Sequence, residues 1–166
     1  MKYLSAYPET LQSEAQALLE QGRLGELLQR KYPGAHGIRT DRALFDHVQA
    51  LKARYLRSAE PLSKVCFDSK LHVIHHALGT HTAISRVQGS QLKAKREIRI
   101  ATVFKEVPLD FLNMIAVHEL AHIRHKAHDK AFYQLCHHML PDYHQVELDV
   151  RLYLTLLEAS GPLAWN

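Results

Sequence analysis

Residues 108–129 read PLDFLNMIAVHELAHIRHKAHD, and this is the stretch of the chain that decides the fold. Apolar and histidine side chains recur in it at spacings of three and four: Phe111, Met114, Ile115, His118 and His122. That spacing predicts a helix over residues 108–124 with these side chains on one face. Pro108 suits the first helical position, and Asp110 complements the positive end of the helix dipole.

Within this helix, His118-Glu119-Leu120-Ala121-His122 has the spacing of a metal site. Side chains four residues apart lie one above the other, so two imidazoles can reach one metal ion at roughly 2.0–2.1 Å. Glu119 follows the first histidine around the helix, where it could meet a water held by the metal. We therefore predict a zinc site with Glu119 as its general base.

The thirteen histidines of the chain make chance matches a fair concern. On this composition, roughly 0.06 matches to the five-residue motif are expected, and roughly 0.005 with a further histidine at the position of His128. The structural alternative is an amphipathic helix whose histidines line the edge of a core. It leaves unexplained why a glutamate and two histidines converge in an otherwise apolar stretch.

Composition bounds the class of protein. With 166 residues, 46% of them hydrophobic, the chain is expected to form a single domain, with residues 1–60 as an N-terminal helical segment and 61–166 as a metallohydrolase core. Residues 1–8 contain no apolar leader, and no apolar run is long enough to span a membrane, so we expect a cytoplasmic protein without a membrane partner. The net charge of +4 does not by itself indicate nucleic acid.

The rest of the chain predicts an α+β fold. Helices are expected at residues 9–22 and 24–32, from a cap at Thr40 or Asp41, at 130–140 after an Asp129 cap, and from a capping box at 142–145 to the stop at 160–162. Three or four strands are expected between them, around residues 65–67, 71–75, 83–87 and 97–104. Cys66 and Cys136 lack a ligand-like spacing and are expected to stay reduced, Cys136 in the core.

Two further clusters of side chains raise functional hypotheses. His72, His75, His76 and His81 could form a second metal site, but alternation along a strand would place His72 and His76 on the side opposite to His75, and surface histidines are favoured. Arg86, Lys93, Lys95, Arg96 and Arg99 concentrate five cations ahead of the metal helix. A solvated strand face is the ordinary explanation, and an anion-binding rim for phosphate or nucleic acid is the functional one.

Several of these motifs together resemble a known family. The residues concerned are Ser85-Arg86, Gly89-Ser90, 118–122, 128–132, 139–141, 142–144 and 147–151, with 70–76 and 78–82 in the N-terminal half. They resemble the YgjP-like family, short bacterial proteins with a zincin-type metallopeptidase domain. The resemblance implies a small zincin-like α+β domain with three metal ligands, His118, His122 and His128, and Glu119 as base.

The resemblance has two qualifications. Metzincin proteases share the histidine spacing but place Gly where this chain has His125, and Gly permits a left-handed turn there. We therefore do not assign the chain to the metzincins. Some zincins take a glutamate from a downstream helix as third ligand, which makes Glu147 a reserve for His128.

The family implies two different substrates, because its fold resembles that of peptidases while members have also been assigned as pyrophosphatases acting on UTP. We expect a zinc-dependent hydrolase, one Zn²⁺ per chain, in which a metal-held water activated by Glu119 attacks a peptide. The alternative is UTP cleavage with the cations of residues 86–99 and Mg²⁺ on the phosphates.

A DNA-associated protease or adaptor is a third hypothesis, disfavoured because no DNA-binding module is recognisable. A scaffold with structural zinc is a fourth, but structural sites saturate four protein ligands.

Overall fold

The computed structural model describes residues 1–71, 84–88 and 91–165, with the backbone alone for 84–88 and 91–95. Within these residues the fold is a mixture of helices and a small sheet. The helices are α1 (Glu9–Glu20), α2 (Leu24–Lys31), α3 (Asp41–Tyr55), α4 (Leu109–Ala121), α5 (Lys130–Met139) and α6 (Tyr143–Ser160). Short 3₁₀ turns form at η1 (Lys2–Leu4) and η3 (Thr102–Phe104). No helix of the described part is long and apolar enough to cross a membrane.

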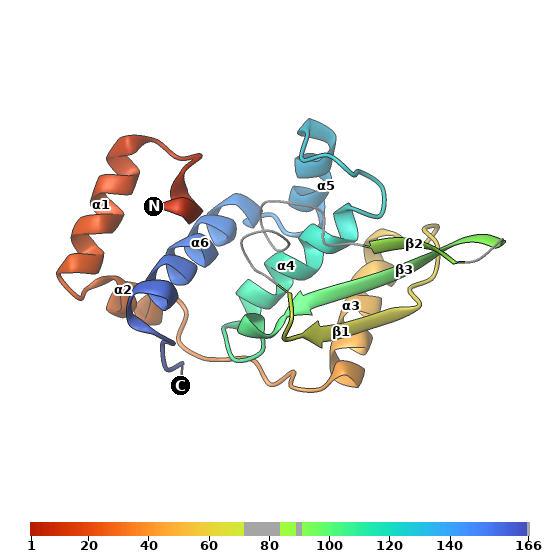
Figure 1. Ribbon diagram of the computed structural model, residues 1–166, viewed down its shortest axis with the longest axis horizontal. Helices are drawn as coiled ribbons and strands as arrows, with labels where there is room; N and C mark the ends of the chain where they lie inside the picture. The colour runs from red at the N-terminus through yellow and green to blue at the C-terminus, as the bar shows by residue number, and fades with distance from the viewer. Residues whose placement is uncertain (72–83, 89–90, 166) are drawn as a thin grey trace.

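The described strands make one mixed sheet in the order β1-β3-β2. Strand β1 (Lys64–Asp68) runs parallel to β3 (Gln91–Ala101), and β2 (Ile84–Gln88) runs antiparallel to β3. Figure 1 shows α3 beside β1, with α4 alongside β3 and α6 between α4 and the N-terminal helices. The sheet therefore supports α4 along its length.

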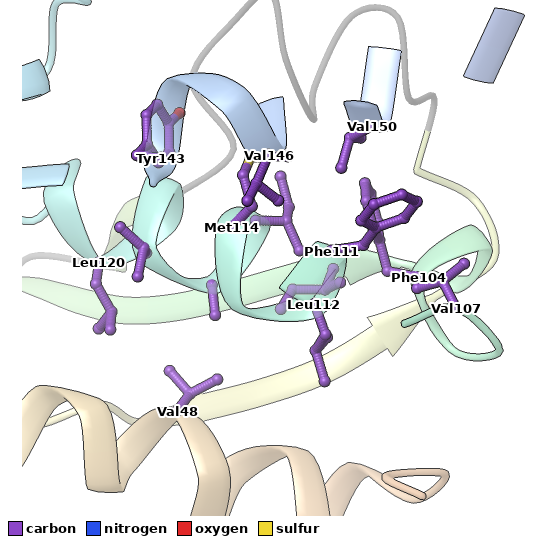
Figure 2. Close-up of a cluster of buried hydrophobic side chains, with 14 of the residues drawn as sticks. Val48, Phe104, Val107, Phe111, Leu112, Met114, Leu120, Tyr143, Val146 and Val150 are labelled. Atoms are coloured by element: carbon purple, nitrogen blue, oxygen red, sulfur yellow. The ribbon is translucent and has the colours of Figure 1, made fainter. Parts of the chain in front are cut away.

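Helix α4 is central to the core because it is apolar on all sides. Every residue from Met114 to Ala121 is buried, which is the burial expected of an all-round hydrophobic helix. Figure 2 shows Met114 beside Val146 of α6 and Leu112 on the opposite side, toward Val48 of α3. Because packing holds α4 from several directions, the side chains at its end have a rigid base.

The N-terminal helices are fastened to α6. The Tyr32 hydroxyl donates to buried Asp149 at 2.5 Å, and the Lys31 ammonium lies 2.7 Å from the same carboxylate. Buried Leu24 and Leu28 of α2 belong to the same hydrophobic cluster as α4 and α6. One cluster of buried side chains thus runs from α2 to the last helix.

Several predicted boundaries need correction. Helix α4 covers Leu109–Ala121 instead of 108–124, and Pro108 precedes it as the N-cap. The strand expected at 97–104 starts earlier, at Gln91, because the polar residues before Glu97 pair with β2. It ends at Ala101, where the chain turns to bury Phe104.

Of the three helix caps expected from the sequence, two form and one does not. Thr40, one of the two residues predicted for this position, caps α3 by accepting from the Ala43 amide, and Asp129 caps α5 by accepting from the Phe132 amide, as predicted. The capping box expected at 142–145 does not form, because Asp142 has φ −91° and ψ 15° and its side chain accepts no hydrogen bond from the helix. A capping residue normally has extended backbone. Cys66 and Cys136 are both buried and unpaired, Cys136 in the core as predicted.

Candidate metal centre

Three histidine side chains meet just beyond the end of α4. His118 is on its last turn, His122 is its C-cap, and His128 lies in the loop before α5. The Nε2 atom of His122 is 3.2 Å from that of His118 and 3.0 Å from that of His128. Among the residues that the structure describes, these three form the one group of potential ligands close enough to share a metal ion, with their ligand atoms within 4.8 Å of one another.

His122 is oriented by the turn that follows the helix. Its Nδ1 lies 2.8 Å from the carbonyl oxygen of His125, which can only accept a hydrogen bond. The proton of neutral His122 must therefore be on Nδ1, and Nε2 carries a lone pair toward the other histidines. The amide of His125 in turn binds the carbonyl of Ala121.

This turn also shows which backbone conformation the chain adopts at His125, the position where metzincins have Gly. No non-glycine residue in the described part has a positive φ, so His125 does not adopt a left-handed conformation. The two hydrogen bonds of His125, one through its amide and one through its carbonyl, close the turn by another route. The backbone itself thus positions the His122 ring.

Helix α6 supplies the contact that orients His118. The Nδ1 atom of His118 is 2.8 Å from the hydroxyl of Tyr143, and that hydroxyl donates to Oε2 of Glu147 at 3.2 Å. Burial and the nearby charge of Glu147 raise the pKa of Tyr143 well above its usual value, so the phenol stays protonated. Glu147 therefore lies one residue away from the histidine cluster, behind Tyr143.

Phe132 of α5 forms an apolar base under all three imidazoles. Its ring stacks on His122 with centroids 4.6 Å apart, and it meets His118 and His128 edge-on at 5.1 and 5.0 Å. The side chain is fully buried, and the Asp129 cap fixes where α5 begins. Phe132 thus keeps the imidazoles together and excludes water from beneath them.

Glu119 is a buried ionisable group next to His118 in the sequence. Its side chain is 0% exposed, and neither carboxylate oxygen has a hydrogen-bond partner among the described residues. Desolvation raises the pKa of Glu119 well above that of an ordinary glutamate. A buried carboxyl left without a partner is costly, and such groups concentrate at sites that bind a cation or handle protons.

Comparison with known proteins identifies the family to which this arrangement belongs. Residues 67–151 match the model described as YgjP-like, metallopeptidase domain, a match that runs from β1 to α6 and includes every side chain of the histidine cluster. The chain belongs to the YgjP-like family. It is 56% identical over 157 residues, 95% of this chain and 94% of the relative, to the protein named UTP pyrophosphatase of Escherichia coli (strain K12). No solved structure gives a significant match.

Both descriptions name hydrolases, so this YgjP-like chain is a hydrolase, and its three-histidine cluster is suited to a metal ion. The stronger of the two likenesses points away from the peptide substrate that the motif alone led us to expect. A relative matched over nearly the full length carries the name of a nucleotide-cleaving enzyme, whereas the family description covers about half of the chain.

The predicted anion-binding cations of this YgjP-like chain differ in whether the structure describes their side chains and in their ion-pair partners. Arg99 lies between two carboxylates, 3.1 Å from Asp68 and 3.3 Å from Glu97, and Arg96 lies 3.4 Å from Glu60. The side chains of Arg86, Lys93 and Lys95 are outside the described residues, although the backbone of Arg86 pairs with that of Lys95. The predicted cluster of His72, His75, His76 and His81 also lies outside the described residues.

Tyr143 is the residue of this YgjP-like site that sequence reasoning missed. The sequence analysis assigned residues 142–145, which include Tyr143, to a capping box at the start of a helix. A signal was present: Tyr143 and Glu147 are four apart on an amphipathic helix, so their polar ends share a face. Nothing in the sequence indicated that this face meets His118.

The Asp129 cap should contribute measurably to stability. Replacing Asp129 with Ala removes the acceptor for the Phe132 amide, and the free energy of unfolding should fall by about 1 kcal/mol. Asp129→Asn keeps a side-chain oxygen and should lose much less. Urea denaturation of the three proteins measures this, and equal losses in both variants would show that the hydrogen bond is not what stabilises α5.

Proposed function

We propose that this chain is a zinc-dependent UTP pyrophosphatase with a zincin-like fold, which holds one Zn²⁺ per chain through His118, His122 and His128. The observation that carries the proposal is the 56% identity, over nearly the whole of both chains, to a protein named UTP pyrophosphatase. The histidine cluster beside an unpartnered glutamate supports the metal-dependent part of it.

The donor set fits zinc. A tetrahedral ion with ligands at 2.0–2.1 Å separates its ligand atoms by about 3.3 Å. The two Nε2 separations of 3.2 and 3.0 Å are close to that value. Imidazole nitrogens are ligands that zinc favours, and three protein ligands leave a fourth position open, as in catalytic sites. Glu119 and Glu147 are not in the cluster, which suits a base and a supporting group respectively.

When bound, zinc supplies a Lewis acid and lowers the pKa of water to about 7. Glu119 then takes the proton of the attacking water, because it follows His118 in the sequence and both its carboxylate oxygens are without a partner among the described residues. For UTP, oxygen from water bonds to the α-phosphorus, the bond to the bridging oxygen breaks, and the products are UMP and pyrophosphate. Phe132 holds the imidazoles in place by stacking on His122.

Phosphate charge must be balanced around this reaction. We propose Arg86, Lys93, Lys95 and Arg96 as the residues that hold the triphosphate, and Mg²⁺ would supply further positive charge for its phosphates. Figure 1 supports this location, because β2 and β3 extend past the end of α4 that leads toward α5. Arg99 is the least suited of the predicted five, because Asp68 and Glu97 already neutralise it.

Incubation with each substrate tests the proposal. Metal-stripped protein should be inactive, and zinc with Mg²⁺ should restore release of UMP and pyrophosphate from UTP, while casein stays intact. The Glu119→Gln variant, purified in the same way, controls for contaminating phosphatases and proteases. Cleavage of casein without cleavage of UTP would reverse the assignment in favour of a peptidase.

A peptidase is the second candidate, and the observation in its favour is the family description as a metallopeptidase domain. Such an enzyme would use the same histidines and Glu119 but would stabilise a single oxyanion. The two candidates therefore differ in their need for cations near the metal. For the DNA-associated role, the family description as a metallopeptidase domain is the one point in favour, and the site adds no other.

Loss of one phosphate-holding cation should lower kcat/KM for UTP about tenfold or more, because charge-assisted contacts contribute roughly 1.5–3 kcal/mol each. Arg86→Ala, Lys93→Ala, Lys95→Ala and Arg96→Ala are the variants to assay at constant ionic strength. Arg42→Ala is the matched control, since it removes the same charge from an exposed position on α3. Unchanged kcat/KM in all four variants would return this stretch to the role of a solvated strand face.

A further inference from the structure

We propose that Tyr143 and Glu147 form a relay that holds the His118 proton on Nδ1, and that this relay sets how tightly the metal binds. The inference rests on the proposed metal site and adds two positioning residues to it. Neither side chain belongs to the histidine cluster, so both would act through His118.

The direction of the hydrogen bonds follows from counting protons. The Tyr143 hydroxyl has one hydrogen and lies 2.8 Å from Nδ1 of His118 and 3.2 Å from Oε2 of Glu147, with the Cys136 thiol as a third and weaker partner. An ionised carboxylate can only accept, so the hydroxyl hydrogen goes to Glu147. The hydroxyl oxygen must then accept from His118, which places the imidazole proton on Nδ1 and leaves the Nε2 lone pair toward His122.

Two nitrogen-bearing side chains lie near the Glu147 carboxylate. The Arg151 guanidinium is 4.0 Å from Oε2, and the ring nitrogen Nδ1 of His144 is 3.9 Å from Oε1. Arg151 is itself held in place by donating to the carbonyl of Tyr3 at 2.9 Å. The Arg151 guanidinium is thus held near Oε2, the same carboxylate oxygen that accepts from the Tyr143 hydroxyl.

The relay differs from the support given to His122. That imidazole donates to a neutral backbone carbonyl, whereas His118 donates to a hydroxyl polarised by a carboxylate. Partners of the second kind orient a metal-binding histidine and raise its basicity, and losing them typically weakens metal affinity 10- to 100-fold.

An ordinary structural role for Tyr143 would give different results. A buried tyrosine needs a partner for its hydroxyl in any case, and Tyr143 is fully buried in the core. If Tyr143 had only this structural role, removing its hydroxyl would lower the free energy of unfolding and leave the zinc affinity unchanged. The experiment must therefore read tautomer and metal affinity separately from folding.

The wild-type protein without metal gives the first reading and does not depend on any change to Tyr143 or Glu147. Long-range ¹H–¹⁵N correlation spectra distinguish protonated from unprotonated ring nitrogens, and the loss of one signal set in His118→Gln assigns the ring. We expect Nδ1 protonated and Nε2 unprotonated. A spectrum with the proton of neutral His118 on Nε2 would overturn the relay.

Variants give the second reading. Tyr143→Phe should weaken zinc binding about 10- to 100-fold in competition with a chelator at neutral pH. Glu147→Gln should cause a smaller loss, because an amide oxygen still accepts but carries no charge. Tyr153→Phe is the matched control: it removes a buried hydroxyl from the same helix, ten residues beyond Tyr143.

The outcomes separate the inference from the function on which it rests. Wild-type protein that binds no zinc would overturn the metal site, and the relay with it. Wild-type protein that binds zinc, with Tyr143→Phe no weaker than Tyr153→Phe, would overturn the relay alone. If Tyr143→Phe fails to fold, Glu147→Gln and the wild-type spectrum still decide, since unchanged zinc affinity in Glu147→Gln contradicts a role for its charge.

Discussion

Glu119→Gln is expected to lower kcat for UTP hydrolysis by about 10²–10⁴-fold, the usual contribution of a general base. Glutamine has nearly the same shape but cannot take a proton from water. The same variant should bind one metal per chain with unchanged affinity, because Glu119 lies outside the histidine cluster. Metal analysis and steady-state kinetics on one preparation measure both properties.

The folding of this variant should not suffer. Both oxygens of Glu119 are buried without a partner among the described residues, so exchanging a carboxyl for a neutral amide removes no hydrogen bond seen there. Glu106→Gln, a change of the same kind at an exposed position, is the control and should keep wild-type kinetics. Wild-type turnover in Glu119→Gln would eliminate the proposed base, and loss of the metal would instead make Glu119 a ligand.

His128→Ala is expected to abolish both stoichiometric zinc and detectable hydrolysis. Structural zinc sites with four ligands bind with about 10–16 kcal/mol, or roughly 3 kcal/mol per ligand, so losing one ligand should weaken binding at least a hundredfold. His125→Ala is the matched control. It removes a nearby imidazole but keeps the carbonyl that accepts from His122, so zinc should be retained.

The alternative third ligand is tested by the same pair of proteins. If His128→Ala keeps full zinc occupancy, the third position belongs elsewhere, and Glu147 is the first residue to examine. In the structure Glu147 contacts the hydroxyl of Tyr143 and is not within the cluster. Full occupancy in His128→Ala together with loss in Glu147→Gln would reverse the roles that we propose for them.

Local signals in the sequence predicted the helices well. Apolar spacing and the Thr40 and Asp129 side chains gave the starts of α3 and α5 correctly, because those caps depend on contacts within three residues. The end of β3 could not be predicted from local signals. Thr102 and Val103 favour a strand by composition, and tertiary burial of Phe104 overrides that preference.

The candidate site was predictable only where its residues are close in the sequence. His118, Glu119 and His122 follow from the period of a helix, and His128 from its short distance beyond them. Tyr143 could not be placed, because it contacts His118 across two helices and the two residues are 25 apart in the sequence. The choice of substrate could not be made either, since the same metal chemistry serves peptides and phosphates.

A cluster built only of imidazoles has little means of choosing among late first-row metals. Copper and nickel bind such nitrogen sites with affinities comparable to that of zinc or higher. Among the residues that the structure describes, neither a thiolate nor a carboxylate joins the three histidines to alter that order of affinity. The ion found in the protein would then reflect which metals the cell or the purification resin supplies. Nickel chromatography would itself be a source of metal, so the ion should be removed and replaced before any comparison of rates.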